Sequence, residues 1–169
     1  LTFGWGSSST RAGGELYKQL TDVEIVDVPY KTNPQATGDV VGGQINVMWA
    51  DLVTAIPMVQ AGKLKALAVT GDKRLGHMPD IPTMQEAGVP GYEMTWWVAA
   101  WTPDGTPPQV IDKLHQAFAN AIAAQKTGEY FRTAGLEPFP TTPDGLMKFQ
   151  MAEHDKWHKL VTAAGIKPQ

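Results

Sequence analysis

The chain has 169 residues, a formal net charge of −3, 43% hydrophobic residues and 18% charged residues, a composition typical of one globular domain or two small ones. Because it has no basic block, nucleic acid or an anionic membrane is not expected as the main partner. The lack of cysteine excludes disulfides and thiolate metal sites, and without an apolar run of about 18 residues the sequence predicts no transmembrane helix.

The chain opens with an apolar run typical of a strand, which breaks at Gly6 and is followed by a run of hydroxyl residues. A helix is expected over 12–20. The first amides of a helix have no intrahelical acceptor and its dipole favours negative charge, so a Gly/Ser turn that opens a helix is a candidate anion site. Two interpretations are open: the turn holds a carboxylate of a small ligand, or Ser8, Ser9 or Thr10 simply caps the helix.

The next part of the chain alternates between strand and helix patterns. Runs rich in β-branched or apolar residues predict strands, and amphipathic stretches between them predict helices. Such alternation with short connections indicates parallel strands in an α/β layer. The expected strands are 23–28, 45–49 and 66–70, and the expected helices are 35–41 and 52–60.

Three turns of this pattern follow strand ends, at 6–10, 29–32 and 50–51. Ligands of open α/β sheets bind outside the carboxyl ends of the strands, so we expect these turns to converge on one rim. Asn33 is expected to cap the second helix, and Asp51 is a candidate cap of the third.

After residue 71 the alternation stops. An extended aromatic stretch is expected over 92–101, and helices with little sheet of their own follow it. Because helices without strands form an incomplete layer, we expect other strands to lie under them. The expected elements are helices over 109–124, 128–133 and 144–163 and a short strand over 135–139.

Several short segments, in their order and spacing, resemble the periplasmic solute-binding proteins of the tripartite tricarboxylate transporters, the Bug-type extracytoplasmic receptors. These segments span nearly the whole chain. They are 14–18, 28–31, 42–48, 61–70, 79–88, 103–107 and 163–168.

The resemblance implies an α/β, periplasmic-binding-protein-like (Venus flytrap) fold. Residues 1–95 would form a complete parallel-sheet lobe that binds the ligand, and residues 96–169 the hinge and the helical part of an incomplete second lobe. The chain would match the C-terminal part of a member, somewhat more than half, and lack the N-terminal part. The implied protein is a periplasmic, non-catalytic monomer without a cofactor that delivers a small organic carboxylate to membrane permease subunits.

The resemblance also implies that the first turn donates amide and hydroxyl hydrogen bonds to a ligand carboxylate. Which serine would contact the ligand stays open. Arg11 falls inside the helix and is expected to be solvated. The candidate ligand-binding residues are Gly6, Ser7, Ser8, Ser9, Thr10, Tyr30, Trp49 and Asp51.

The last three candidates each have a structural alternative. Tyr30 offers its hydroxyl to a ligand or simply packs. Trp49 forms a flat apolar wall of the site or belongs to the core. Asp51 would repel an anion, so it serves an amine, a hydroxyl or an ordered water, or else it caps a helix.

Other chemistries receive less support. His154 and His158 are spaced one helical turn apart, with Asp155 nearby, but the sequence is not the HExxH arrangement of zinc proteases. No catalytic residue or metal ligand is therefore expected. The rival function is an α/β enzyme that uses the Gly/Ser turn as an oxyanion or phosphate cradle. A third possibility is a remnant of a longer receptor with only weak binding.

Overall fold

The structure is a computed structural model that describes residues 1–165. The chain divides into two compact units, one formed by residues 1–96 and the chain from Lys159, the other by residues 97–158. Among the described residues, no helix has both the length and the apolar character that crossing a bilayer requires.

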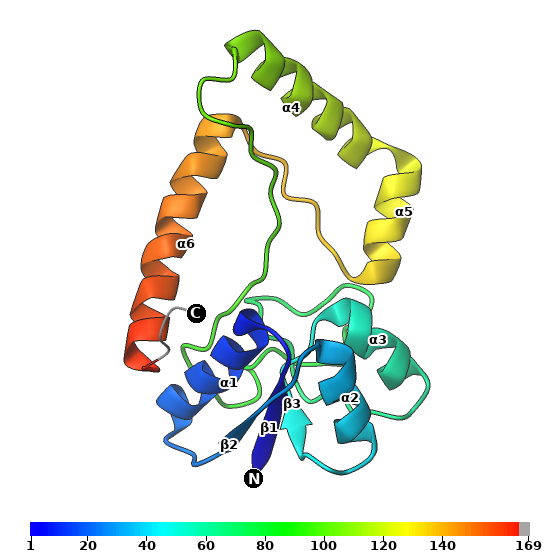
Figure 1. The fold of residues 1–169 in the computed structure, drawn as a ribbon. Coiled ribbons are helices and arrows are strands. Elements are labelled where there is room, and N and C mark those ends of the chain that lie inside the picture. Colours follow the sequence, from blue (N-terminus) through cyan, green and yellow to red (C-terminus); the bar gives the residue numbers. More distant parts are fainter. Residues whose placement is uncertain (166–169) are drawn as a thin grey trace. The chain divides into compact units, whose positions relative to one another are not determined.

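The first unit is built on a parallel sheet of β1 (Thr2–Trp5), β2 (Val26–Pro29) and β3 (Val47–Met48), in the order β2-β1-β3. A helix follows each strand: α1 (Ser8–Thr21), α2 (Asn33–Val41) and α3 (Leu52–Gln60) (Figure 1). The α/β pattern expected for this part of the chain is therefore confirmed. Helix α1 begins a turn earlier than expected, at Ser8.

The central strand β1 is covered on both faces. Phe3 is fully buried against Gly14 of α1, whereas Gly4 faces the opposite way, toward Ala36 of α2. Side chains alternate between the faces of a strand, so α1 and α2 cover opposite faces of the sheet. Because helices cover both faces of the sheet, the ends of the strands are the part of the sheet that these helices leave uncovered.

Two glycines let α1 approach the sheet closely. A Cβ atom on Gly14 would overlap the Phe3 ring, and one on Gly13 would lie 2.7 Å from the Trp49 ring. The fully buried Tyr92 donates a hydrogen bond of 2.9 Å to the Gly13 carbonyl, which ties the later part of this unit to α1.

The strand expected over 66–70 is wrong. This segment makes one parallel bridge, between Val69 and Thr83, and Leu67 is 62% exposed. A short apolar run does not by itself identify a strand of a sheet, because apolar character does not show whether a neighbouring strand is there to pair with it.

The second unit holds α4 (Pro108–Ala123), α5 (Gln125–Ala134) and most of α6 (Pro143–Ala163) (Figure 1). These helices were expected from the sequence within a few residues. No strand is found in residues 97–158, so the short strand expected over 135–139 is wrong. No residue of the three helices, all of which are described, is buried.

An aromatic cluster joins two segments of the second unit. The Trp97 ring lies 6.0 Å from that of Trp101 and 5.2 Å from that of Phe149. The indoles of Trp97 and Trp157 both donate to the Glu153 carboxylate, at 3.1 and 3.2 Å. Packing and hydrogen bonds within the unit thus account for these three tryptophans.

Candidate ligand-binding site

The turns that follow β1, β2 and β3 meet at one edge of the sheet, as the parallel strands require. A Cβ atom on Gly6 would overlap the backbone of Thr32 and Asn33 in the second turn. The first two turns therefore touch backbone to backbone, and only glycine leaves room for this contact.

A capping box holds the start of α1. The amide of Thr10 donates to the Ser7 hydroxyl at 3.4 Å, and the Thr10 hydroxyl accepts from the Ser7 amide at 3.2 Å. Ser7 is thus the N-cap, not one of the three residues after it, because its extended backbone precedes the first helical residue.

Asn33 joins all three turns through its side chain. Its Oδ1 atom accepts from the Gly6 amide at 3.0 Å and from the Thr10 hydroxyl at 3.2 Å, and its Nδ2 atom donates to Asp51 at 2.9 Å. The expectation that Asn33 caps α2 is wrong. Thr32 is the N-cap, with an extended backbone and no side-chain cap bond, and the Asn33 side chain bonds to these tertiary partners instead.

Asp51 caps α3, which was one of the two interpretations of this residue, the other being contact with a ligand. Its Oδ1 atom accepts from the Thr54 amide at 2.9 Å and from the Thr54 hydroxyl at 2.7 Å. Burial alone would raise the pKa of Asp51, but the hydrogen bonds from Thr54 and Asn33 outweigh it, so the pKa lies below its ordinary value. Asp51 is therefore a fixed negative charge with both oxygens engaged.

The first two amides of α1 have no protein acceptor among the described residues. Ser8 and Ser9 are the first two helical residues, and no acceptor for their amides is found within residues 1–165. The Ser8 side chain is exposed, and the Ser9 hydroxyl lies 3.1 Å from that of Ser7. The first helical turn of α1 contains no acidic residue, so no side chain there neutralises the positive end of the helix dipole.

Two of the candidate residues have partners elsewhere. Trp49 packs with its ring 5.5 Å from those of Phe3 and Tyr17, which fits the core alternative. Tyr30 donates a hydrogen bond of 2.7 Å to Asp39, and this bond raises the pKa of Tyr30. Within the described chain, no hydrogen bond or ring contact links these two side chains to the first turn.

Arg11 also turns away from the first turn. Its guanidinium lies 3.6 Å from the Asp27 carboxylate and 5.0 Å from the centre of the Trp5 ring. The Trp5 indole donates to the same carboxylate at 3.0 Å. Arg11 thus forms a partly covered ion pair with Asp27 at the surface. It is not the fully solvated side chain expected from the sequence.

Other parts of the molecule provide weaker candidates. No group of three potential metal ligands occurs in residues 1–165, and the His154 and His158 rings simply stack, 6.2 Å apart.

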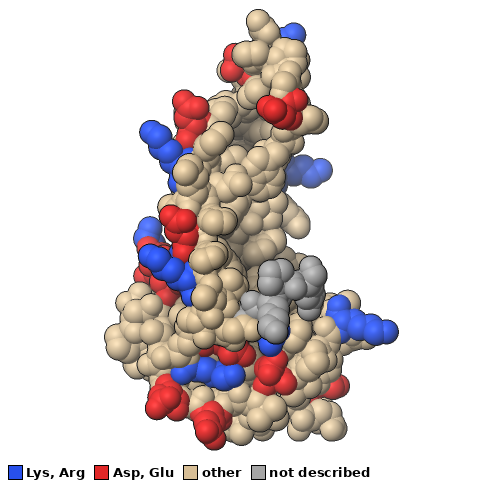
Figure 2. Space-filling view, turned by 60° about the vertical axis from the view of Figure 1, so that its left-hand side comes forward, with Lys and Arg blue, Asp and Glu red and all other residues tan. Residues whose placement is uncertain are grey.

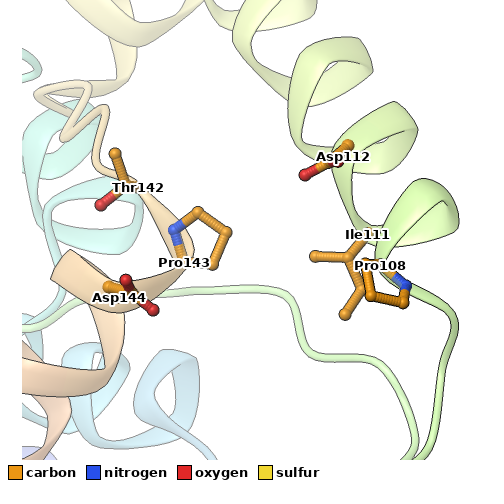
Figure 3. Close-up of a pocket in the computed structure, with 6 residues that line it drawn as sticks. All are labelled: Pro108, Ile111, Asp112, Thr142, Pro143 and Asp144. Atoms are coloured by element: carbon orange, nitrogen blue, oxygen red, sulfur yellow. The ribbon is translucent and has the colours of Figure 1, made fainter.

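On the face drawn in Figure 2, basic and acidic side chains lie interspersed. Figure 3 shows an open pocket of the second unit, between the starts of α4 and α6; it is lined by Pro108, Ile111, Asp112, Thr142, Pro143 and Asp144.

The chain spans about half the length of most of the curated relatives it matches. It is 31% identical over 153 residues to BugT of Bordetella pertussis, which is 90% of this chain and 47% of BugT. A protein encoded in the tcbD–tcbE intergenic region of Pseudomonas sp. strain P51 is 30% identical over 155 residues, 91% of this chain and 46% of that protein.

Solved structures of similar fold include periplasmic binding proteins. R. palustris Rpa4515, solved with adipate, is 33% identical with a TM-score of 0.90, over 100% of this chain and 57% of that one. The periplasmic binding protein BugD is 29% identical with a TM-score of 0.87, over 100% and 58%. MatC of Rhodopseudomonas palustris, with bound malate, is 29% identical with a TM-score of 0.79, over 95% and 56%.

These similarities confirm the periplasmic-binding-protein-like fold class expected from the sequence. The sequence model of a protein family, described as the tripartite tricarboxylate transporter family receptor, matches residues 2–166, nearly the whole chain. The resemblance seen in the short sequence segments is thereby confirmed, and the chain belongs to the family of tripartite tricarboxylate transporter receptors.

Proposed function

We propose that this chain binds a small organic carboxylate outside the cytoplasm and presents it to the membrane subunits of a tripartite tricarboxylate transporter. Membership of the receptor family supports this function, as do the adipate and malate found with two structures of similar fold. Because the chain spans about half of its relatives, the proposal concerns the part of the site that these residues provide.

The single observation that carries the proposal is the start of α1. The amides of Ser8 and Ser9 point out of the helix beside a rim that Asn33 holds together. One carboxylate oxygen on each amide would gain two charge-assisted hydrogen bonds in the favourable field of the helix dipole. Ser7 and Thr10 would support this arrangement through the capping box rather than touch the ligand.

The remaining candidates take indirect roles in this proposal. Trp49 would support α1 from the core side, because it packs against Gly13. Tyr30 and Asp51 would shape the neighbouring turns, since their polar atoms already have protein partners.

The enzymatic rival would need a general base beside the first turn. Asp51 is the acidic candidate on this rim, but its lowered pKa makes it a weak base and both its oxygens hold other donors. A receptor role needs no such base, so the geometry favours binding over catalysis.

The proposal is tested by titrating the ¹⁵N-labelled chain with malate and adipate while the backbone amide resonances are followed. We expect saturable shifts at Ser8 and Ser9, and no such shifts with the uncharged diamide of malate. Saturable binding of either acid that leaves both amides unmoved, or no binding at all, would contradict the proposal.

Two variants at the same position separate the amide from the hydroxyl. Ser8→Pro removes the amide hydrogen at the first helical position, where proline is well tolerated, and we expect about tenfold weaker carboxylate binding. Ser8→Ala keeps the amide and removes the exposed hydroxyl, so we expect it to bind like the wild type.

A further inference from the structure

We propose that Asn33 is a positioning and specificity-determining residue of the carboxylate site, an inference that rests on the proposed function. Its neutral amide holds the first turn, residues 6–10, in place. The amide also lies between this turn and the negative charge of Asp51. Nothing in the sequence pattern indicated this role, because the residue has the features of an ordinary helix cap.

The geometry fixes the orientation of the Asn33 amide. The Gly6 amide and the Thr10 hydroxyl face Oδ1 at 3.0 and 3.2 Å, and the Asp51 carboxylate faces the other atom at 2.9 Å. A backbone N–H can only donate and an ionised carboxylate can only accept. Oxygen therefore lies toward Gly6 and the NH₂ group toward Asp51.

This orientation positions the anion site through the residues on either side of it. Gly6 and Thr10 flank the residues whose amides would receive the carboxylate, and Thr10 is itself buried. Asn33 thus connects the capping box of α1 to the cap of α3 through Asp51 and Thr54. A change at Asn33 is transmitted to the ligand through the first turn, without direct contact.

The chemical identity of residue 33 also determines the charge at the rim. Aspartate has nearly the same shape and would accept the same bonds from Gly6 and Thr10. It would, however, place a negative charge beside the start of α1 and could not donate to Asp51 when ionised. An amide at this position satisfies every partner and leaves the helix end positive, which favours an anionic ligand.

The decisive variant exchanges the two residues, Asn33→Asp together with Asp51→Asn. The carboxylate now at position 33 would accept from Gly6, from Thr10 and from the new amide at position 51, whose oxygen would accept from Thr54. Every hydrogen bond of the wild type is retained and only the charge moves toward α1. We expect a melting temperature within a few degrees of the wild type and malate binding weaker by about tenfold or more.

The matched control is Asn46→Ala. Asn46 also bridges through its Oδ1 atom, to the amide and hydroxyl of Thr2 at 2.9 and 3.1 Å, but at the opposite end of β1. We expect its malate affinity to equal that of the wild type. A folded exchange variant that binds malate as tightly as the wild type would overturn the specificity role.

A ligand-independent measurement tests the positioning role. In Asn33→Ala the Gly6 amide loses its 3.0 Å acceptor and keeps only the longer 3.3 Å bond to the Thr10 hydroxyl, which itself loses its bond to Asn33. We therefore expect hydrogen exchange at Gly6 to accelerate at least tenfold, with little change in Asn46→Ala. Unchanged exchange at Gly6 would overturn the positioning role. If the wild type itself fails to bind malate, the proposed function fails, and the Gly6 result still decides the positioning role on its own.

Discussion

At the scale of single residues, the rim depends on close contacts that only particular side chains permit. Gly6 lies against the backbone of the next turn, where a Cβ atom has no space. Asp51 holds a helix and a neighbouring turn with the same carboxylate. Each of these two residues can be tested by substitution.

Gly6→Ala is expected to destabilise the chain by about 1–3 kcal/mol, because the new methyl group must displace the backbone of Thr32 and Asn33. Chemical denaturation gives the free energy of unfolding. Gly38→Ala is the matched control: it lies inside α2 with open space around its Cβ position, so about 0.5–1 kcal/mol of added stability is expected. Equal stability of Gly6→Ala and the wild type would show that the two turns do not touch.

Asp51→Ala is expected to lose about 0.5–2 kcal/mol at pH 7 through removal of the α3 cap. Because the folded state lowers the pKa of Asp51, this contribution is fully present above the ordinary value of 3.8 and is lost as the pH falls below it. The difference in unfolding free energy between wild type and variant should therefore shrink between about pH 5 and about pH 2. The exposed Asp72, changed to alanine, serves as the control, and a pH-independent difference at position 51 would contradict the assignment.

At the scale of elements, α1 covers one face of the sheet and is bonded to a segment far along the chain. Its glycines admit Phe3 and Trp49, and its Gly13 carbonyl accepts from Tyr92, 79 residues further along the chain. Burial raises the pKa of Tyr92 far above its usual value, so the hydroxyl stays protonated as the donor.

Tyr92→Phe should therefore cost about 0.5–1.5 kcal/mol of unfolding free energy, since the ring still fills its space and only the hydrogen bond is lost. Thermal and denaturant unfolding measure this cost. Tyr130→Phe, at a 60% exposed tyrosine, should leave stability unchanged. A Tyr92→Phe variant as stable as the wild type would mean that this bond does not help to hold α1.

The elements also show how far sequence reasoning reaches. The β1–α1, β2–α2 and β3–α3 alternation follows from local patterns, which is why it was predicted correctly. The Asp51 cap was one of the two interpretations that the same local pattern left open. Asn33 was misassigned because its partners, Gly6 and Asp51, are distant in sequence and only the folded sheet brings them together. The false strand over 66–70 has the same origin, since apolar character alone does not supply a pairing partner.

At the scale of the whole molecule, the two units differ in how much they bury. The fully buried side chains Phe3 and Tyr92 both lie in the first unit, whereas α4, α5 and α6 contain no buried residue. Large apolar side chains of the second unit remain exposed, including Trp101, Phe118 and Met151. Because local stability follows buried apolar contacts, the units should not be equally stable.

Hydrogen exchange should therefore distinguish the units. Amides in the middle of α4 are expected to exchange at least tenfold faster than those of β1 and the middle of α1, after correction for intrinsic rates. Mass spectrometry of peptides covering each helix provides the measurement. Equal protection of α4 and α1 would show that the helices of the second unit are stabilised by contacts beyond those described.

The central claim, that a carboxylate binds at the start of α1, is tested most directly by a crystal structure of the protein grown with malate. The account predicts a malate carboxylate within hydrogen-bond distance of the Ser8 and Ser9 amides, with Asn33 still bridging Gly6 and Asp51. Malate bound elsewhere, for example in the pocket beside Asp112 and Asp144, with the start of α1 holding only water, would contradict it.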